Sequence, residues 1–156
     1  MRITVLCSDL GIRVPGTKGA SLHLAAITGA LAKIGHSVQL VGVAGHGPPP
    51  AGIESLLLEH PGRSVGLRRE LRKLAFTEHL ADSARGRIAE FGPDVIYERL
   101  ALFGTAGLRL SGQLGIPHVV EVNSLLAQEE STWRGLQLVD IACGENRRCL
   151  AARICG

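Results

Sequence analysis

Polar side chains stand at the ends of three separate apolar runs in this sequence. They are Ser8-Asp9, Tyr97-Glu98-Arg99, and Glu121 with Asn123. Parallel strands place their carboxyl ends at one edge of a sheet, and open α/β sheets bind ligands at that edge. We therefore predict that these hydrogen-bonding groups line a single crevice.

The first apolar run leads into a long glycine loop that ends in Gly16-Thr17-Lys18-Gly19-Ala20-Ser21-Leu22-His23. A loop of this kind, followed by a helix, directs backbone amides and the positive end of the helix toward a bound anion. Ser21 is the predicted N-cap of that helix. His23 falls in its first turn, where it either donates a hydrogen bond to an oxygen in the crevice or packs locally.

Two common nucleotide-binding motifs are incomplete in this loop. The segment 11–18 resembles G-x-x-x-x-G-K-[ST], but Thr17 and Lys18 stand in the reverse order. That motif needs Lys at the β/γ-phosphates and the next hydroxyl on Mg²⁺, so a nucleotide triphosphatase is disfavoured. The loop over 8–19 is also too long for a dinucleotide site and lacks the G-x-G-x-x-G spacing.

The spacing of apolar residues predicts the elements that position these groups. Apolar runs predict strands over 3–7, 38–43, 94–99 and 118–123, and helical spacing predicts helices over 20–34, 67–91, 100–114 and 125–138. The stripe of the first helix is Leu24, Ile27, Leu31 and Ile34, and Gly35 is suited to end that helix in a left-handed conformation. Between 44 and 66 we expect a proline-rich loop, a short helix over 53–59 and a poor strand over 63–67.

This alternation of strands and helices predicts the α/β class. We expect a single Rossmann-like domain, with a mostly parallel sheet and helices on both faces, over residues 1–140. Residues 141–156 are expected to form an irregular or helical tail.

Composition limits the classes of partner. The chain has 156 residues, 46% of them hydrophobic, and its net charge of +3 is too small to indicate a nucleic-acid partner. Arg68, Arg69, Arg72 and Lys73 share one broad face of a predicted helix. That face is either a solvated surface or a contact for anionic lipid head groups or a phosphorylated acceptor.

The cysteines favour a reduced protein without a metal site. Cys7 ends a buried strand and is expected to be a small core residue. Cys143, Cys149 and Cys155 crowd into the tail without a C-x-x-C pair, which is unlike a metal site. We expect a cytoplasmic protein. The N-terminus lacks a secretory pattern and no apolar stretch reaches the roughly 20 residues of a membrane helix, so any membrane contact is expected to be peripheral.

Four blocks of the sequence, in register, resemble one protein family. They are 16–23 with its G-x-x-x-H ending, Gly35-His36-Ser37-Val38, Asp94-Val95-Ile96-Tyr97-Glu98-Arg99, and Ile116-Pro117-His118-Val119-Val120-Glu121-Val122-Asn123. Together they look like the N-terminal half of GT-B glycosyltransferases of family 4, over residues 1 to about 135. The resemblance implies half of a GT-B fold and a retaining transfer from a nucleotide sugar to an acceptor hydroxyl, with no metal required.

The resemblance also implies roles for individual residues. Gly16, Thr17, Lys18 and Gly19 would approach the donor phosphates across the cleft, and the acceptor side would be Tyr97, Glu98, Arg99 and Glu121. His23 and Asn123 would be the catalytic residues near the reaction centre. Many family members place a His at the end of the last of these strands, whereas this sequence has Asn123 there and His118 at the strand's start.

Half of the expected enzyme has no counterpart in this sequence. In that family a second α/β domain grips the nucleoside diphosphate and ends with an E-x-x-x-x-x-x-x-E motif, and we expect that domain to be absent from this sequence. Transfer from a nucleotide sugar needs cations at the leaving phosphate and exclusion of water. We therefore expect this chain alone to be inactive, and to be one lobe that is truncated or completed by a second-lobe chain. The surface that would face the second lobe also invites self-association.

Two other functions remain open on the sequence alone. One is a non-catalytic Rossmann-like module that binds a small polar ligand in the same crevice. The other is an unrelated Rossmann-like enzyme that uses a nucleotide. Tight binding of NAD or ATP by the isolated chain would favour the latter.

Overall fold

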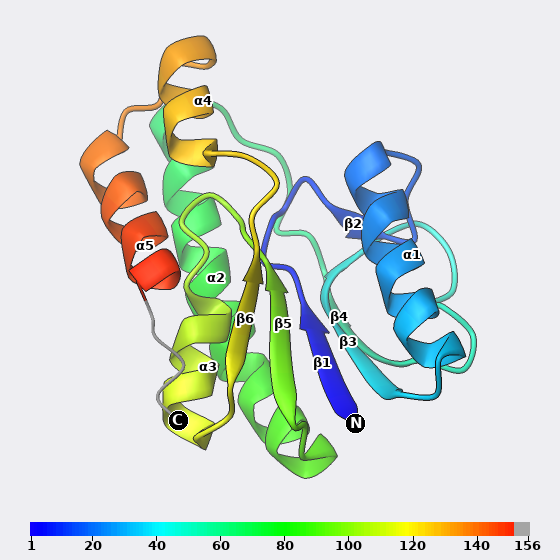
Figure 1. Cartoon of the computed structure of the whole chain (residues 1–156). Helices are drawn as coiled ribbons and strands as arrows, with labels where there is room; N and C mark the ends of the chain where they lie inside the picture. Colours follow the sequence, from blue (N-terminus) through cyan, green and yellow to red (C-terminus); the bar gives the residue numbers. More distant parts are fainter. Residues whose placement is uncertain (152–156) are drawn as a thin grey trace.

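The computed structural model describes residues 1–151 and shows a parallel sheet with helices on both faces (Figure 1). The elements are β1 (Arg2–Leu6), β2 (Arg13–Val14), α1 (Gly19–Lys33), β3 (Ser37–Ala44), β4 (Glu54–Leu58), α2 (Gly66–Phe91), β5 (Val95–Arg99), α3 (Ala106–Leu114), β6 (His118–Glu121), α4 (Leu126–Trp133) and α5 (Val139–Ala151). The predicted class, with helices on both faces of a parallel sheet, is confirmed.

The sheet places β1 at its centre. β1 pairs in parallel with β3 on one side and with β5 on the other, and β5 pairs in parallel with β6. β4 pairs with the other side of β3, while the two-residue β2 continues beside the end of β3. Because every pair is parallel, the carboxyl ends of β1, β5 and β6 share one edge. In particular, Arg99 is paired with Glu121.

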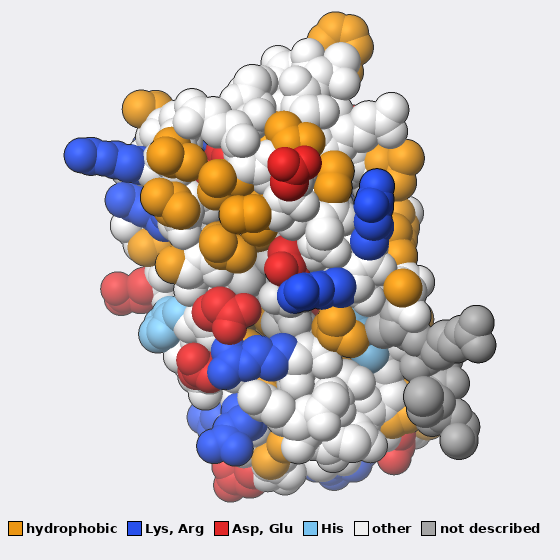
Figure 2. Space-filling model, turned by 90° about the vertical axis from the view of Figure 1, so that its left-hand side faces the viewer, with side chains coloured by type: hydrophobic (Ala, Val, Ile, Leu, Met, Phe, Trp, Pro, Cys, Tyr) orange, Lys and Arg blue, Asp and Glu red, His pale blue; other side chains and the backbone are white. Residues whose placement is uncertain are grey.

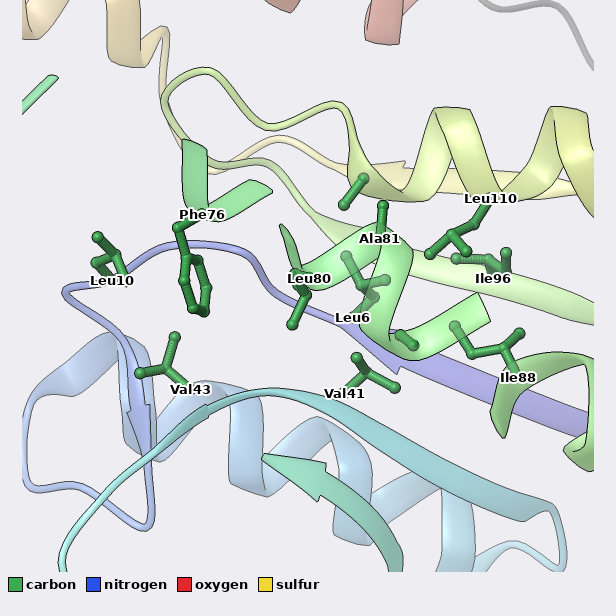
Figure 3. Close-up of a cluster of buried hydrophobic side chains, with 12 residues drawn as sticks. Leu6, Leu10, Val41, Val43, Phe76, Leu80, Ala81, Ile88, Ile96 and Leu110 are labelled. Atoms are coloured by element: carbon green, nitrogen blue, oxygen red, sulfur yellow. The ribbon is translucent and has the colours of Figure 1, made fainter. Parts of the chain in front are cut away.

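Alternation along the strands divides the core into two layers. Val5 and Leu40 face α1 and pack with its Leu24, while Leu6 and Val41 face α2 and α3. Figure 3 shows the second layer, in which the α2 side chains lie over the sheet. Strands that are covered on both faces are apolar at nearly every position, which explains the continuous apolar runs of the sequence.

α1 begins and ends close to the predicted positions. Its N-cap is Lys18, not Ser21, so that prediction was wrong: Ser21 is a buried residue inside the helix. Gly35 has a φ of +94° just after the helix, as predicted. Leu24 is fully buried, but Ile34 is 70% exposed and is the C-cap residue that follows the last turn of α1.

The segment between β3 and α2 was predicted incorrectly. The expected short helix over 53–59 is the strand β4, and the expected strand over 63–67 is a loop followed by the start of α2. Leu56 and Leu58 pack into one core layer and Leu57 into the other. Side chains that alternate between two sides are typical of a strand. A run of five residues is too short to distinguish this pattern from that of a helix.

α3 starts later than predicted, at Ala106 in place of Leu100. The intervening residues form a buried loop in which Phe103 adopts a φ of +63°. A left-handed residue of this kind cannot continue a right-handed helix. Phe103 anchors a third hydrophobic cluster with Ala127 of α4 and Ala142 of α5.

The predicted helix over 125–138 ends earlier, since α4 stops at Trp133 and α5 begins at Val139. Exposed apolar side chains on these two helices include Trp133, Ile141 and Leu150. Figure 2 shows hydrophobic side chains gathered on the upper part of this side of the molecule. The self-association expected from the sequence stays a prediction. Within residues 1–151, no helix has the length and apolar character needed to cross a bilayer.

Candidate functional site

The carboxylate of Glu121 is the meeting point of four side chains. Its Oε1 lies 2.8 Å from His23 Nε2, in an ion-pair contact, and accepts a hydrogen bond from Arg99 Nη1 at 2.9 Å. Asn123 Nδ2 donates to the same oxygen at 2.7 Å. The Tyr97 hydroxyl donates to Oε2 at 2.8 Å. We call these five residues the Glu121 cluster.

The order of the strands brings this cluster together. Tyr97 and Arg99 are two positions apart on β5, so they face the same side of the sheet. Arg99 is paired with Glu121 on the neighbouring strand β6. α1 packs on the same side of the sheet, against β2 and β3, and contributes His23 from its first turns. Of the polar strand ends predicted to converge, the structure thus brings together those of Tyr97, Arg99, Glu121 and Asn123. Ser8 and Asp9 make no hydrogen bond or ion pair with this cluster in the described residues, so their part of the prediction is not met.

The surroundings of Glu121 favour its charged form. Burial alone raises the pKa of this carboxyl, but hydrogen bonds from Asn123 and Tyr97 and the charges of His23 and Arg99 outweigh burial and lower the pKa below its usual 4.5. Burial also raises the pKa of Tyr97 to about 12, with the Glu121 hydrogen bond and charge acting in the same direction. At neutral pH the cluster therefore holds an ionised Glu121 beside a protonated Tyr97.

Glu98 does not join the Glu121 cluster. Its side chain points to the opposite face of β5, is 0% exposed, and lies 2.9 Å from Nε2 of His118. The backbone N–H of Gly107 donates to its other carboxylate oxygen at 3.2 Å. A residue with a side chain would not fit at position 107, because a Cβ on Gly107 would lie 2.4 Å from Glu98 Oε2. In this structure Glu98 connects β5, α3 and β6.

A pocket of about 980 Å³ opens beside the N-terminus of α1, and we call it the loop pocket. Gly16, Thr17 and Lys18 line it, as does Ser21. Gly19, the fourth member of the predicted donor-phosphate loop, is exposed and forms the first residue of α1. The first amides of a helix have no partner within the helix, so this end of α1 offers donors and a partial positive charge to an anion.

The close approach of backbone segments explains Gly16. A Cβ at this position would lie 2.4 Å from the carbonyl oxygen of Arg13 and 2.8 Å from Oγ of Ser21. By contrast, nothing lies within 4 Å of a Cβ built on Gly19. Only a glycine therefore fits the bend at Gly16, whereas space beside Gly19 is open.

The opposite wall of the loop pocket contains residues that sequence reasoning did not place there. Arg69, Arg72 and Lys73 of α2 face it, together with His60 and Arg63 from the preceding loop. Their helical spacing indicated a shared face, but only the fold reveals that this face lies opposite Arg13 and Lys18.

The cysteines show no metal-binding arrangement within the described part of the chain. Cys7 is fully buried in the core, as predicted, and burial raises the pKa of its thiol to about 12. Cys149 donates to the carbonyl oxygen of Gly104 at 2.9 Å. Across residues 1–151, no three His, Cys, Asp or Glu side chains gather in a way that could hold a metal. Cys155 lies outside the described residues.

Comparison with known proteins places the chain in a family. Residues 18–144 match the family model described as glycosyl transferase 4-like domain. The chain belongs to this family. The resemblance found in the four sequence blocks, to the N-terminal domain of family 4 GT-B glycosyltransferases, is thereby confirmed. A search of curated proteins gave no match.

Solved structures agree with this glycosyl transferase 4-like assignment at the level of the fold. Sucrose-phosphate synthase from Thermosynechococcus elongatus superposes with a TM-score of 0.73 at 15% identity, over 97% of this chain and 40% of that one. The glycosyltransferase SsfS6 of Streptomyces sp. SF2575 has a TM-score of 0.53 at 20% identity, over 97% and 45%. A UGT transferase from Siraitia grosvenorii, solved in complex with UDP, has a TM-score of 0.50 at 15% identity, over 88% and 33%. This chain thus spans less than half the length of each.

Proposed function

We propose that this chain is the acceptor-side lobe of a retaining, nucleotide-sugar-dependent glycosyltransferase. The single observation that carries the proposal is the Glu121 cluster, in which side chains of α1, β5 and β6 meet at the carboxyl edge of the sheet. The family match to a glycosyl transferase 4-like domain supplies the class of reaction. When complete, the enzyme transfers a sugar from its nucleotide to an acceptor hydroxyl.

The cluster suits the binding of a hydroxyl. Oε1 of Glu121 already accepts two hydrogen bonds, from Arg99 and Asn123, and contacts His23, whereas Oε2 accepts one bond, from Tyr97. A carboxylate has about four acceptor sites in total, two on each oxygen. Oε2 therefore has room for a hydrogen bond from an acceptor hydroxyl. Because Glu121 stays ionised at neutral pH, that bond is charge-assisted and strong.

His23 and Asn123 are the proposed catalytic residues, and Arg99 and Tyr97 orient the acceptor through Glu121. The side chain of His23 is 46% exposed, so it can exchange its contact with Glu121 for one with a ligand. Asn123 lies beside the same oxygen, where its amide is available to the sugar being transferred. Glu98, fully covered, is proposed as a positioning residue that fixes β5 behind Tyr97 and Arg99.

The loop over Gly16–Gly19 is proposed to face the donor diphosphate. Its backbone amides and the N-terminus of α1 stabilise negative charge on the leaving phosphate without a metal ion. The donor itself is gripped mainly by a second lobe, which is where the remaining cations must come from. One lobe forms half a cleft, so the purified chain is expected to show no appreciable sugar transfer.

The test is to combine the purified chain with the donor lobe of a GT-B relative, add UDP- or GDP-sugars, and measure nucleotide release with a panel of acceptors. Nucleotide-sugar binding is expected only in the presence of the second lobe, with release that falls in His23→Ala and Arg99→Ala. Tight binding of NAD or ATP by the chain alone would refute the proposal in favour of a different Rossmann-like enzyme. Ligand binding without transfer in the assembled protein would indicate a non-catalytic binding module.

A further inference from the structure

The loop pocket is lined by cations and by no acidic side chain. Its charged residues are Arg13, Lys18, Arg63, Arg69, Arg72 and Lys73. The whole chain has 17 Lys and Arg against 14 Asp and Glu. If positive and negative side chains were distributed at random, some carboxylates would be expected among the residues that line a pocket of this size. The segregation of positive charge is therefore a local property of this pocket and is not a consequence of composition.

Three segments far apart in the sequence supply these charges. Arg13 and Lys18 come from the glycine loop before α1, and Arg63 comes from the loop before α2. Residues 69, 72 and 73 of α2 stand three and four positions apart, so they project from one side of that helix. The cations thus face one another across a hollow of about 980 Å³.

Little of this charge is neutralised within residues 1–151. Arg69 is the exception, because its Nη2 lies 3.2 Å from Oε2 of Glu130. Arg72 donates to the carbonyl oxygen of Pro61 at 3.0 Å, which holds the loop but adds no negative charge. Lys18 and Lys73 form no ion pair in the described part of the chain. Like charges gathered in a pocket repel one another and attract an anion.

His60 lies in the field of these cations. It lines the loop pocket, and its pKa is lowered first by burial and then by the charges of Arg13 and Arg72, with a further contribution from Arg63. A neutral imidazole can accept a hydrogen bond or donate one, which suits a ligand carrying both hydroxyl and anionic oxygens.

We infer that the loop pocket binds a ligand bearing a phosphate group. Guanidinium groups match the geometry of phosphate oxygens, and several cations are needed to compensate a group whose charge approaches −2. The lining contains no Phe, Tyr or Trp on which a base could stack, so a nucleic acid is disfavoured. The volume exceeds what a free phosphate needs and leaves space for the rest of a small molecule or a head group.

The assignment of this phosphate to the acceptor rests on the proposed function. The donor diphosphate is expected at Gly16–Gly19, on one side of the pocket. His60, Arg63, Arg72 and Lys73 line the same pocket but belong to other segments than that loop, and we assign them to a phosphate on the acceptor. The acceptor would accordingly be a phosphorylated compound, either a soluble phosphomonoester or the head group of a phospholipid.

The test measures binding and requires no sugar transfer. The purified chain is titrated by calorimetry or NMR with inorganic phosphate, glycerol 3-phosphate and glucose 6-phosphate, and with glycerol and glucose as uncharged counterparts. Sedimentation with phosphatidylglycerol vesicles, compared with phosphatidylcholine vesicles, forms the second arm. Binding of the soluble phosphates identifies a soluble ligand, and binding of anionic vesicles alone identifies a lipid head group. No preference for phosphate in either arm would overturn the inference.

Matched variants locate the binding. The double variant Arg63→Gln, Lys73→Gln removes two pocket charges and is expected to weaken phosphate binding by about tenfold or more. Arg68→Gln, Arg85→Gln removes the same charge from exposed positions outside the pocket and is expected to retain binding. Equal loss in both double variants would show non-specific attraction and overturn the site. Circular dichroism of each variant verifies that it is folded.

Failure of this inference and failure of the proposed function are distinguishable. If the assembled enzyme transfers sugar to neutral acceptors while the loop pocket ignores phosphate, the phosphate site is wrong and the glycosyltransferase proposal stands. If phosphate binding depends on Arg63 and Lys73 but the assembled enzyme transfers no sugar, the phosphate site is correct and only its assignment to an acceptor is wrong.

Discussion

His23 of α1 and Glu121 of β6 lie in direct contact, with His23 Nε2 2.8 Å from Glu121 Oε1. The two residues differ in exposure: the His23 side chain is nearly half exposed, whereas Glu121 and Arg99, a second of its four partners, are largely covered. The covered pair forms the fixed part of the site. The exposed imidazole is the part that an incoming ligand can displace or recruit.

Replacing His23 should therefore affect binding more than stability. An exposed ion pair or hydrogen bond contributes about 0.2–1 kcal/mol to stability, so His23→Ala is expected to unfold at nearly the wild-type denaturant concentration. In the assembled enzyme, sugar transfer should fall by about tenfold or more, the equivalent of one lost hydrogen bond of roughly 1.4 kcal/mol. His23→Gln, which retains an N–H donor, should recover part of the activity. Unchanged transfer in His23→Ala would assign this residue a structural role.

The lowered pKa of Glu121 predicts a pH-dependent contribution to stability. The folded state holds this carboxylate ionised below its usual pKa of 4.5. The contribution is complete above the unfolded pKa and is lost as the pH falls through the folded pKa. The difference in free energy of unfolding between wild type and Glu121→Gln should hence be constant above about pH 6 and shrink below pH 4.5. Urea titrations between pH 3 and 7 measure it, and a difference that grows on acidification would contradict the assignment.

Tyr97 should be one cause of that lowered pKa. Tyr97→Phe keeps the aromatic ring and removes the 2.8 Å hydrogen bond to Oε2 of Glu121. We expect the pKa of Glu121 to rise toward 4.5 and the free energy of unfolding to fall by about 0.5–1.5 kcal/mol. Carbon-13 NMR of the side-chain carboxyl follows the titration directly. An unaltered pKa of Glu121 in this variant would mean that Asn123, His23 and Arg99 are sufficient to lower that pKa without Tyr97.

The sequence allowed much of this site to be predicted, because its residues end strongly patterned elements. The segment from β1 to β3 contains a long helix that ends before Gly35. Both features identify it as a strand–helix–strand unit. The alternation of β5 could also have separated Glu98 from Tyr97 and Arg99, since neighbouring strand residues face opposite sides. β4 could not be assigned, because a short apolar run fits a buried strand and a buried helix equally well.

The loop pocket lay beyond prediction for a different reason. Arg13, Lys18 and Arg72 come from segments whose meeting depends on how α2 crosses the sheet. The local spacing of residues 68–73 contains no information on what faces them. The late start of α3 is a similar case: a left-handed Phe103 is stabilised by its burial against α4 and α5, a tertiary effect that no local pattern encodes.

The contact between α3 and Glu98 should make Gly107 intolerant of a side chain. A Cβ there would lie 2.4 Å from Glu98 Oε2 and 2.6 Å from His118 Nε2. Gly107→Ala is expected to destabilise the fold by about 1–3 kcal/mol, the usual cost of overpacking. Gly112→Ala is the control, because nothing lies within 4 Å of its Cβ on the same helix. Alanine there should leave stability unchanged or raise it by up to about 1 kcal/mol, and equal destabilisation of both variants would contradict the packing argument.

Gly16 and Gly19 offer a second matched pair, at the loop pocket. In Gly16→Ala the new methyl group would meet the Arg13 carbonyl oxygen at 2.4 Å, so the backbone between β2 and α1 must shift. Because that oxygen belongs to the main chain, the shift should displace the loop that lines the pocket, and both stability and phosphate binding should decrease. In Gly19→Ala the new methyl group meets no atom within 4 Å and lies at the first position of α1. The free energy of unfolding of this variant should therefore match that of the wild type within about 0.5 kcal/mol.

Amide chemical shifts over residues 10–22 would distinguish the two variants: widespread changes are expected in Gly16→Ala and only local ones in Gly19→Ala. Local changes in both would show that the loop accommodates a side chain at Gly16 and that the bend does not require glycine.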